Sequence, residues 1–100
     1  MNSKAASLGL VLPSIHLNGT SRAELQNQYL AAVLALLDAV DKLRAAAPHG
    51  RDYYPQDGEP TKFGTTLRKA QQQHDRWTRQ VETVLAEVVA IGEEIATKPA

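Results

Sequence analysis

The sequence contains no cysteine, which excludes disulfide bridges and thiolate metal sites from this chain. It also lacks an excess of charge of either sign, because Lys and Arg total 11 and Asp and Glu total 11. A balanced chain has no overall field with which to attract nucleic acid or an anionic membrane. We therefore expect neither to be a major partner of this protein.

Catalytic and membrane motifs are missing as well. There is no glycine-rich phosphate loop and no H-E-x-x-H motif. His16, His49 and His74 are far apart, whereas a metal site needs three or four convergent ligands. The apolar run over residues 7–13 is too short to span a bilayer and weak as a signal peptide. We expect a soluble cytoplasmic protein, not an enzyme, without metal or cofactor.

Helical periodicity is what the sequence does contain. Ser21 followed three residues later by Glu24 matches a capping box, which predicts Ser21 as an N-cap. Apolar residues then recur every three or four positions, until Pro48 and Gly50 stop the pattern. These signals predict a helix over residues 21–47.

The middle of this helix is apolar on more than one side. Residues 29–37 are apolar without interruption, so that a second stripe lies beside the first. Its members are Leu30, Val33, Leu34 and Leu37. One partner helix cannot cover both stripes.

A second helix is predicted over residues 61–96, joined to the first by a loop over 48–60. Its apolar residues are spaced alternately by four and three, as in a heptad seam. The seam consists of Phe63, Leu67, Ala70, His74, Trp77, Val81, Val84, Val88, Ile91 and Ile95. Gly64 is a poor interior residue, so the helix could begin as late as Thr65 or Thr66.

Pairing the two helices from the turn outward places Leu36 near His74 and Leu25 near Val84. His74 is then either a core histidine whose ring finds a carbonyl, or a polar residue that sets the register.

These elements predict an all-α fold, a long antiparallel helical hairpin over residues 18–97. A short irregular extension, residues 1–17, precedes it. Two helices make too small a core in water, so we expect a helical-bundle homo-oligomer, most simply a four-helix dimer. The alternative is a monomer in which residues 8–17 cover the exposed apolar surface.

The start of the first helix is one candidate binding site. Free amides, hydroxyls and an arginine at the positive end of a helix dipole suit a phosphate or carboxylate. The residues concerned are Gly19, Thr20, Ser21 and Arg22. An ordinary capping box with an exposed arginine explains the same pattern.

The loop is the other candidate, because its 13 residues exceed the usual two to eight. Arginine there could pair with an anion, and tyrosine could stack on a base. The candidates are His49, Arg51, Tyr53 and Tyr54. The first helix separates the two candidate sites by about 40 Å. They can share a ligand only across a subunit boundary.

A secondary basic face follows one side of the second helix, formed by Arg68, Arg76 and Arg79. Cations in the first turns of a helix oppose its dipole, which suggests an anionic partner. Acidic residues of a neighbouring subunit would explain them equally well. Binding of nucleic acid through this face is the weakest interpretation, given the zero net charge.

The segments IHLNGTSRAELQNQYLAAVLALLDAV and APHGRDYYPQ, with the helix from QQQH to EEI, carry a resemblance over residues 15–95. They resemble a pattern in small, mostly uncharacterised helical proteins encoded by phages and prophages. The resemblance implies no established activity and no residue roles. It implies a non-enzymatic protein in the host cytoplasm, which sequesters a ligand or occupies a host protein.

Our functional hypothesis is an oligomer that sequesters an anionic, nucleotide-like signalling ligand. The alternative is a protein-interaction module, such as an inhibitor of a host defence factor or a small virion or packaging component. In that case the contact surface is the apolar stripe at Leu30, Leu34 and Leu37.

Overall fold

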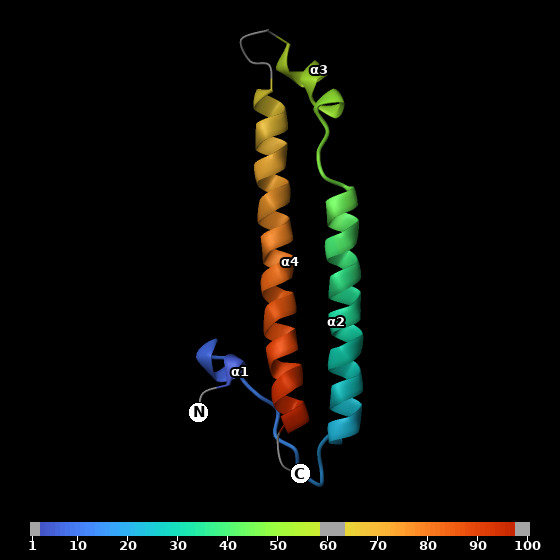
Figure 1. Cartoon of the computed structure of the whole chain (residues 1–100), viewed down its shortest axis with the longest axis vertical. Coiled ribbons are helices and arrows are strands. Elements are labelled where there is room, and N and C mark those ends of the chain that lie inside the picture. The colour runs from blue at the N-terminus through green and yellow to red at the C-terminus, as the bar shows by residue number, and fades with distance from the viewer. Residues whose placement is uncertain (1–2, 59–63, 98–100) are drawn as a thin grey trace.

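The chain folds as a long antiparallel helical hairpin with a short N-terminal arm (Figure 1). The computed structural model describes residues 3–58 and 64–97, and every regular element within them is helical. The elements are α1 (Lys4–Ser7), α2 (Arg22–Ala45), the 3-10 helix η1 (Gly50–Asp52), α3 (Tyr54–Asp57) and α4 (Thr65–Thr97). The predicted all-α hairpin is confirmed.

The molecule is a rod. Its principal extents are 66 × 25 × 18 Å and its radius of gyration is 20.0 Å. A compact domain of this length has a radius of gyration of about 13 Å. Most side chains therefore lie close to the surface, and the buried apolar residues among those described are only Ala5, Val40, Ala90 and Ile95.

α2 begins where the capping box predicts. Ser21 is the N-cap, and its hydroxyl accepts a hydrogen bond from the amide of Glu24 at 3.2 Å. The helix ends at Ala45, shortly before Pro48, which pushes the residue ahead of it out of the α region.

α4 begins at Thr65, directly after Gly64. Gly64 has a φ of +87°, a left-handed conformation that glycine adopts without strain. This start agrees with the expectation that Gly64 delays the helix. The earlier start at Thr61, with Phe63 as the first member of the seam, lies outside the described residues.

The connection between the long helices is more ordered than the predicted loop. It contains η1 and α3, and α3 packs against α4 (Figure 1). A Cβ atom on Gly50 would lie 3.5 Å from Cδ2 of Leu67, so the connection also approaches the first turns of α4 closely. The first turns of α4 are therefore covered by the connection rather than by α2.

The predicted register of the two helices is wrong for that reason. The Nε2 atom of His74 donates a hydrogen bond to the carbonyl oxygen of Leu43, whereas the sequence placed Leu36 beside His74. Nearer the other end, a Cβ atom on Gly92 would lie 3.7 Å from Cβ of Tyr29. His74 is half-buried and bonded to a carbonyl, as the core-histidine interpretation predicted.

The heptad seam does not stay on the face of α4 that contacts α2. Trp77 and Val84, two of its predicted members, are 45 and 47% exposed, while the neighbouring residues Thr78 and Leu85 are less exposed. A straight α-helix drifts by about 20° per heptad, so a seam four heptads long turns by about 80° around the helix. The late members of the seam consequently face away from α2.

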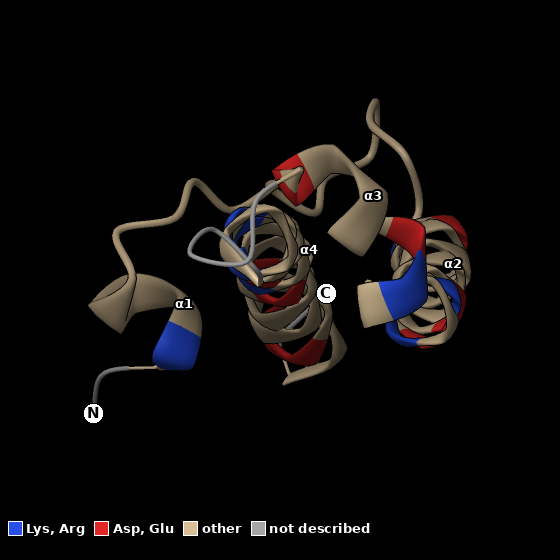
Figure 2. Cartoon of the chain, turned by 90° about the horizontal axis from the view of Figure 1, so that it is seen from above, with Lys and Arg blue, Asp and Glu red and all other residues tan. Residues whose placement is uncertain are grey.

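The N-terminal arm packs against the side of α4 that faces away from α2. α1 and α2 lie on opposite sides of α4, as Figure 2 shows looking down the rod. α1 packs against α4, Ala5 is fully buried, and Ile95 is only 1% exposed. The extension was expected to be irregular, yet it contains this helical turn. It leaves Leu30, Leu34 and Leu37 of α2 (the outer stripe) 57, 58 and 46% exposed.

Candidate functional site

The start of α2 carries the first group of predicted site residues. Gly19, Thr20 and Ser21 are exposed, and the hydroxyl of Ser21 accepts the Glu24 amide as a helix cap. The imidazole of His16 lies directly over Gly19, since a Cβ atom on Gly19 would come within 2.8 Å of its Nε2. The fold thus adds a histidine that the sequence had not assigned to this end.

Arg22 differs from its exposed neighbours. The residue is half-buried, and its Nε and Nη2 atoms are buried without a hydrogen-bond partner in the described part of the chain. Buried donors usually have partners, because leaving one unsatisfied costs about 1–3 kcal/mol. The guanidinium of Arg22 is therefore the feature of this end that most clearly calls for an anion.

The connection carries the second group of predicted residues. A cavity of about 290 Å³ lies between the connection and the start of α4. Its lining residues are Gly50, Arg51, Tyr54, Asp57, Gly64 and Leu67. The fold thus brings Arg51 and Tyr54 together in the lining of one cavity. His49 and Tyr53 are not among the lining residues.

Asp57 is the residue of this end that sequence reasoning missed. Its carboxylate accepts hydrogen bonds from the amides of Gly64 and Thr66, at 2.7 and 3.0 Å, and from the hydroxyl of Thr66. The Thr66 hydroxyl contributes most to lowering the pKa of Asp57, both amides and Arg68 lower it further, and desolvation opposes them. Asp57 thus supplies the negative charge that the start of α4 lacks in its own first turn.

The sequence did contain a signal for this contact. Asp57-Gly58 is a turn dipeptide, and a long helix with cations but no acid near its start needs a cap from elsewhere. Because Asp57 lies seven and nine residues before its partners, the usual capping patterns do not include it. The carboxylate of Asp57 also offsets part of the positive charge of α4, through its electrostatic interaction with Arg68.

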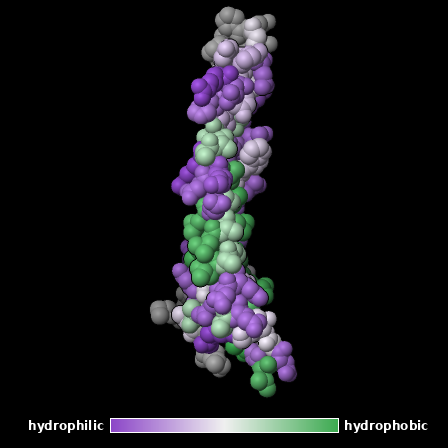
Figure 3. All heavy atoms as spheres, turned by 90° about the vertical axis from the view of Figure 1, so that its right-hand side faces the viewer, coloured by the Kyte–Doolittle hydropathy of each residue, from purple (hydrophilic) through white to green (hydrophobic). Residues whose placement is uncertain are grey.

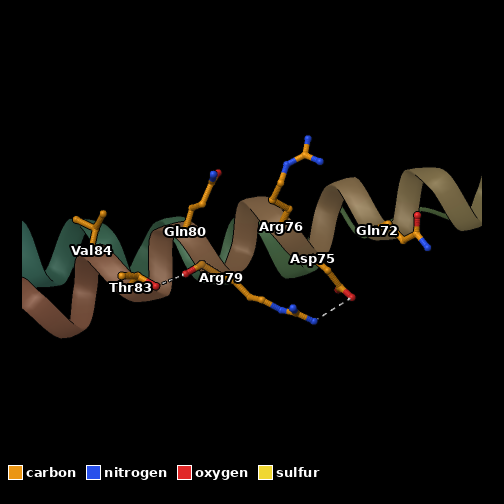
Figure 4. A pocket seen from close by; sticks show the side chains of 7 residues that line it. All are labelled: Gln72, Asp75, Arg76, Arg79, Gln80, Thr83 and Val84. Atoms are coloured by element: carbon orange, nitrogen blue, oxygen red, sulfur yellow. Dashed lines mark hydrogen bonds and ion pairs between the residues drawn. The ribbon is translucent and has the colours of Figure 1, made fainter.

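Two further basic residues, Arg76 and Arg79, line one hollow of about 580 Å³ on α4, together with Asp75. Figure 4 shows Arg76 and Arg79 on α4 pointing in different directions. Arg79 lies 4.0 Å from the carboxylate of Asp75, and both side chains are largely exposed. Such a surface ion pair contributes about 0–1 kcal/mol and leaves the face open to solvent. The two predicted binding regions at the start of α2 and at the connection lie at opposite ends of the rod (Figure 1).

An exposed apolar surface lies on α2. Figure 3, which looks onto the α2 side, shows a hydrophobic patch near the middle of the rod with hydrophilic surface above and below it. The outer stripe lies on this helix. Two hollows, of about 540 and 380 Å³, follow one groove between α2 and α4. Leu30 and Leu37 line the α2 side of the groove, and Ala86 and Val89 the α4 side.

Metal and membrane sites have no support in residues 3–58 and 64–97. No group of three or more metal-binding side chains occurs there. No helix in this part is long and apolar enough to cross a membrane. Comparison of the chain with protein-family models, with curated proteins and with solved structures found no match.

Proposed function

We propose that this protein is a non-enzymatic interaction module that acts as a homo-oligomer of helical hairpins. The observation that carries the proposal is its accessible surface, which is 7344 Å². A compact monomer of this mass exposes about 5,600 Å². The excess of about 1,700 Å² is twice the roughly 800 Å² that each partner buries in a standard interface.

The location of the excess surface supports the same conclusion. The N-terminal arm covers α4 at Ile95, but the outer stripe of α2 keeps about half of each leucine in contact with water. Exposed contiguous apolar surface on a soluble protein is typical of interaction sites. A hairpin with so few buried residues gains core by pairing with another hairpin.

Sedimentation equilibrium or light scattering on the intact chain tests the proposal. We expect a mass of at least two chains at micromolar concentration. A mass of one chain across that range would contradict it.

Binding of an anionic ligand is a second candidate function, supported by the buried, unpartnered nitrogens of Arg22. Phosphate, or a nucleotide-like ligand that carries it, has the negative charge and the acceptor oxygens to which the unpartnered nitrogens of Arg22 would donate hydrogen bonds. Thr20 and the free amides at the start of α2 would add donors.

Calorimetry with inorganic phosphate and with mono-, di- and cyclic nucleotides tests this candidate. We expect Arg22→Gln to abolish the heat of binding and Arg79→Gln, a control on the exposed face of α4, to retain it. A double variant, Arg51→Ala with Tyr54→Ala, shows whether the connection takes part. Absence of heat from every compound, with the oligomer intact, would rule out ligand sequestration.

The resemblance to phage-encoded proteins makes a host protein a further candidate partner. A host protein that used the outer stripe would compete with self-association. The two partners are distinguished by whether the purified chain is already oligomeric.

A further inference from the structure

We propose that the cavity between the connection and the start of α4 binds a small aromatic carboxylic acid. The cavity lies at the end of the rod that carries η1 and α3 (Figure 1). The site is additional to the proposed function, because it lies at the opposite end from Arg22 and does not require self-association.

The size of the cavity selects a ligand of one or two rings. Its volume is about 290 Å³. An engineered cavity of about 150 Å³ in another protein binds benzene, whereas sites for drug-sized ligands occupy about 300–1,000 Å³. The cavity therefore has room for a single ring with a short substituent, or for two fused rings.

The lining favours an apolar, planar body. Gly50 and Gly64 contribute only backbone to it, Leu67 contributes an aliphatic side chain and Tyr54 an aromatic one. Glycine lets a ligand approach the backbone closely, and two aromatic rings attract each other beyond the effect of the area that they bury. An aromatic ring matches all four of these residues.

Gly50 keeps the cavity open although its backbone does not require glycine. Its φ is not positive, unlike that of Gly64, so a side chain is compatible with its conformation. A Cβ atom there would meet Cδ2 of Leu67 at an ordinary 3.5 Å. Filling such a space commonly stabilises a protein, so the glycine is better explained by a ligand that occupies the space.

Arg51 selects a carboxylate as the polar group of the ligand. Arg51 and Asp57 are the charged residues of the lining, and Asp57 already accepts three hydrogen bonds at the start of α4 and interacts with Arg68. Arg51 is exposed, and no described carboxylate forms an ion pair with it; Asp52 follows it in the chain but is not part of the lining. One guanidinium matches the single charge and the two oxygens of a carboxylate, whereas a phosphate monoester carries about −1.5 to −2 at pH 7.

Ligand-observed NMR by saturation transfer on the intact chain tests the site, with indole-3-carboxylate as the probe. Indole has the same rings without the acid, and acetate has the acid without the rings. We expect indole-3-carboxylate to bind with a Kd below about 1 mM, indole to bind about tenfold more weakly, and acetate to show no binding.

Substitutions assign the two parts of the ligand to their residues. Arg51→Gln should raise the Kd of indole-3-carboxylate about tenfold and leave that of indole unchanged, and Arg76→Gln, an exposed control on α4, should change neither. Gly50→Leu fills the cavity and should abolish binding of both ring compounds. Leu67→Phe fills it from the α4 side, and circular dichroism checks the helix content of both filled variants.

The site is overturned if neither ring compound shows saturation transfer, if acetate binds as well as indole-3-carboxylate, or if both filled variants still bind. Should the filled variants lose helix content, the comparison of Arg51→Gln with Arg76→Gln decides alone, and equal Kd values for the two would overturn the assignment. Arg22→Gln should bind the probe as the unsubstituted protein does. Failure at this cavity therefore leaves self-association and the anion site at Arg22 standing.

Discussion

Truncation of Leu34 to alanine provides a quantitative test of the self-association surface. Burying a leucine fully contributes about 1.5–3 kcal/mol, and Leu34 is 58% exposed, so about 1 kcal/mol is available from covering the rest. A two-fold interface contains this leucine twice. Leu34→Ala should therefore weaken the dimer by about 2 kcal/mol, which raises Kd about 30-fold. Alanine is a strong helix former, so α2 itself should persist.

Sedimentation velocity over a dilution series measures this change in Kd, and circular dichroism checks the helix content. Val84 offers a matched control because it is 47% exposed but lies on α4, away from the outer stripe. Val84→Ala should leave Kd unchanged within about two-fold. An unchanged Kd for Leu34→Ala, or an equal loss for both variants, would refute the assignment of the interface to the outer stripe.

Three further predictions concern the hairpin itself. Ile95 is fully buried near the end of α4, so Ile95→Ala should lower the free energy of unfolding in urea by about 2–4 kcal/mol. Val11 is 91% exposed, and Val11→Ala should lower it by less than about 0.5 kcal/mol. Equal losses for the two variants would contradict the burial of Ile95. Because the pKa of Asp57 lies below its ordinary value of 3.8, its stabilising contribution is present above that pH and is lost as pH falls through the lowered value. The melting temperatures of Asp57→Asn and the unsubstituted protein should accordingly differ at pH 6, and the difference should shrink as the pH falls below 3.8; a constant difference would count against the carboxylate's role. Gly92→Ala places its Cβ atom at an ordinary 3.7 Å from Tyr29, so it should raise the unfolding free energy by about 0.5–1 kcal/mol, whereas a loss would show that the helices lie closer together than described.

The sequence predicted the two long helices because their signals are local. The Ser21 cap, Pro48 and Gly64 each act on the backbone within a few residues, and the heptad spacing extends over most of α4. The register between the two helices has no such local signal in the sequence. It depends on the structure of the connection, in which η1 and α3 have only three and four residues, too few to form a periodic pattern.

The candidate site was predicted only in part for the same reason. Arg51 and Tyr54 were identified by residue type and do share a cavity, but Asp57 was missed because its partners Gly64 and Thr66 lie farther along the chain. The burial of Arg22 was not foreseen, since an arginine at a helix start is usually exposed. The regular seam spacing placed Trp77 in the core, whereas its side chain is 45% exposed in the structure.

The contacts that fix the register also determine how the hairpin would respond to force. His74 holds α4 to the end of α2 near the connection, and the close approach of Gly92 to Tyr29 fixes the helices at the opposite end. The start of α2 and the end of α4 lie together at that opposite end (Figure 1). Tension applied between them would separate the helices one turn at a time, beginning at Tyr29, instead of shearing the whole interface at once. The hairpin should therefore open at low force, and the His74 contact should be the last between α2 and α4 to break.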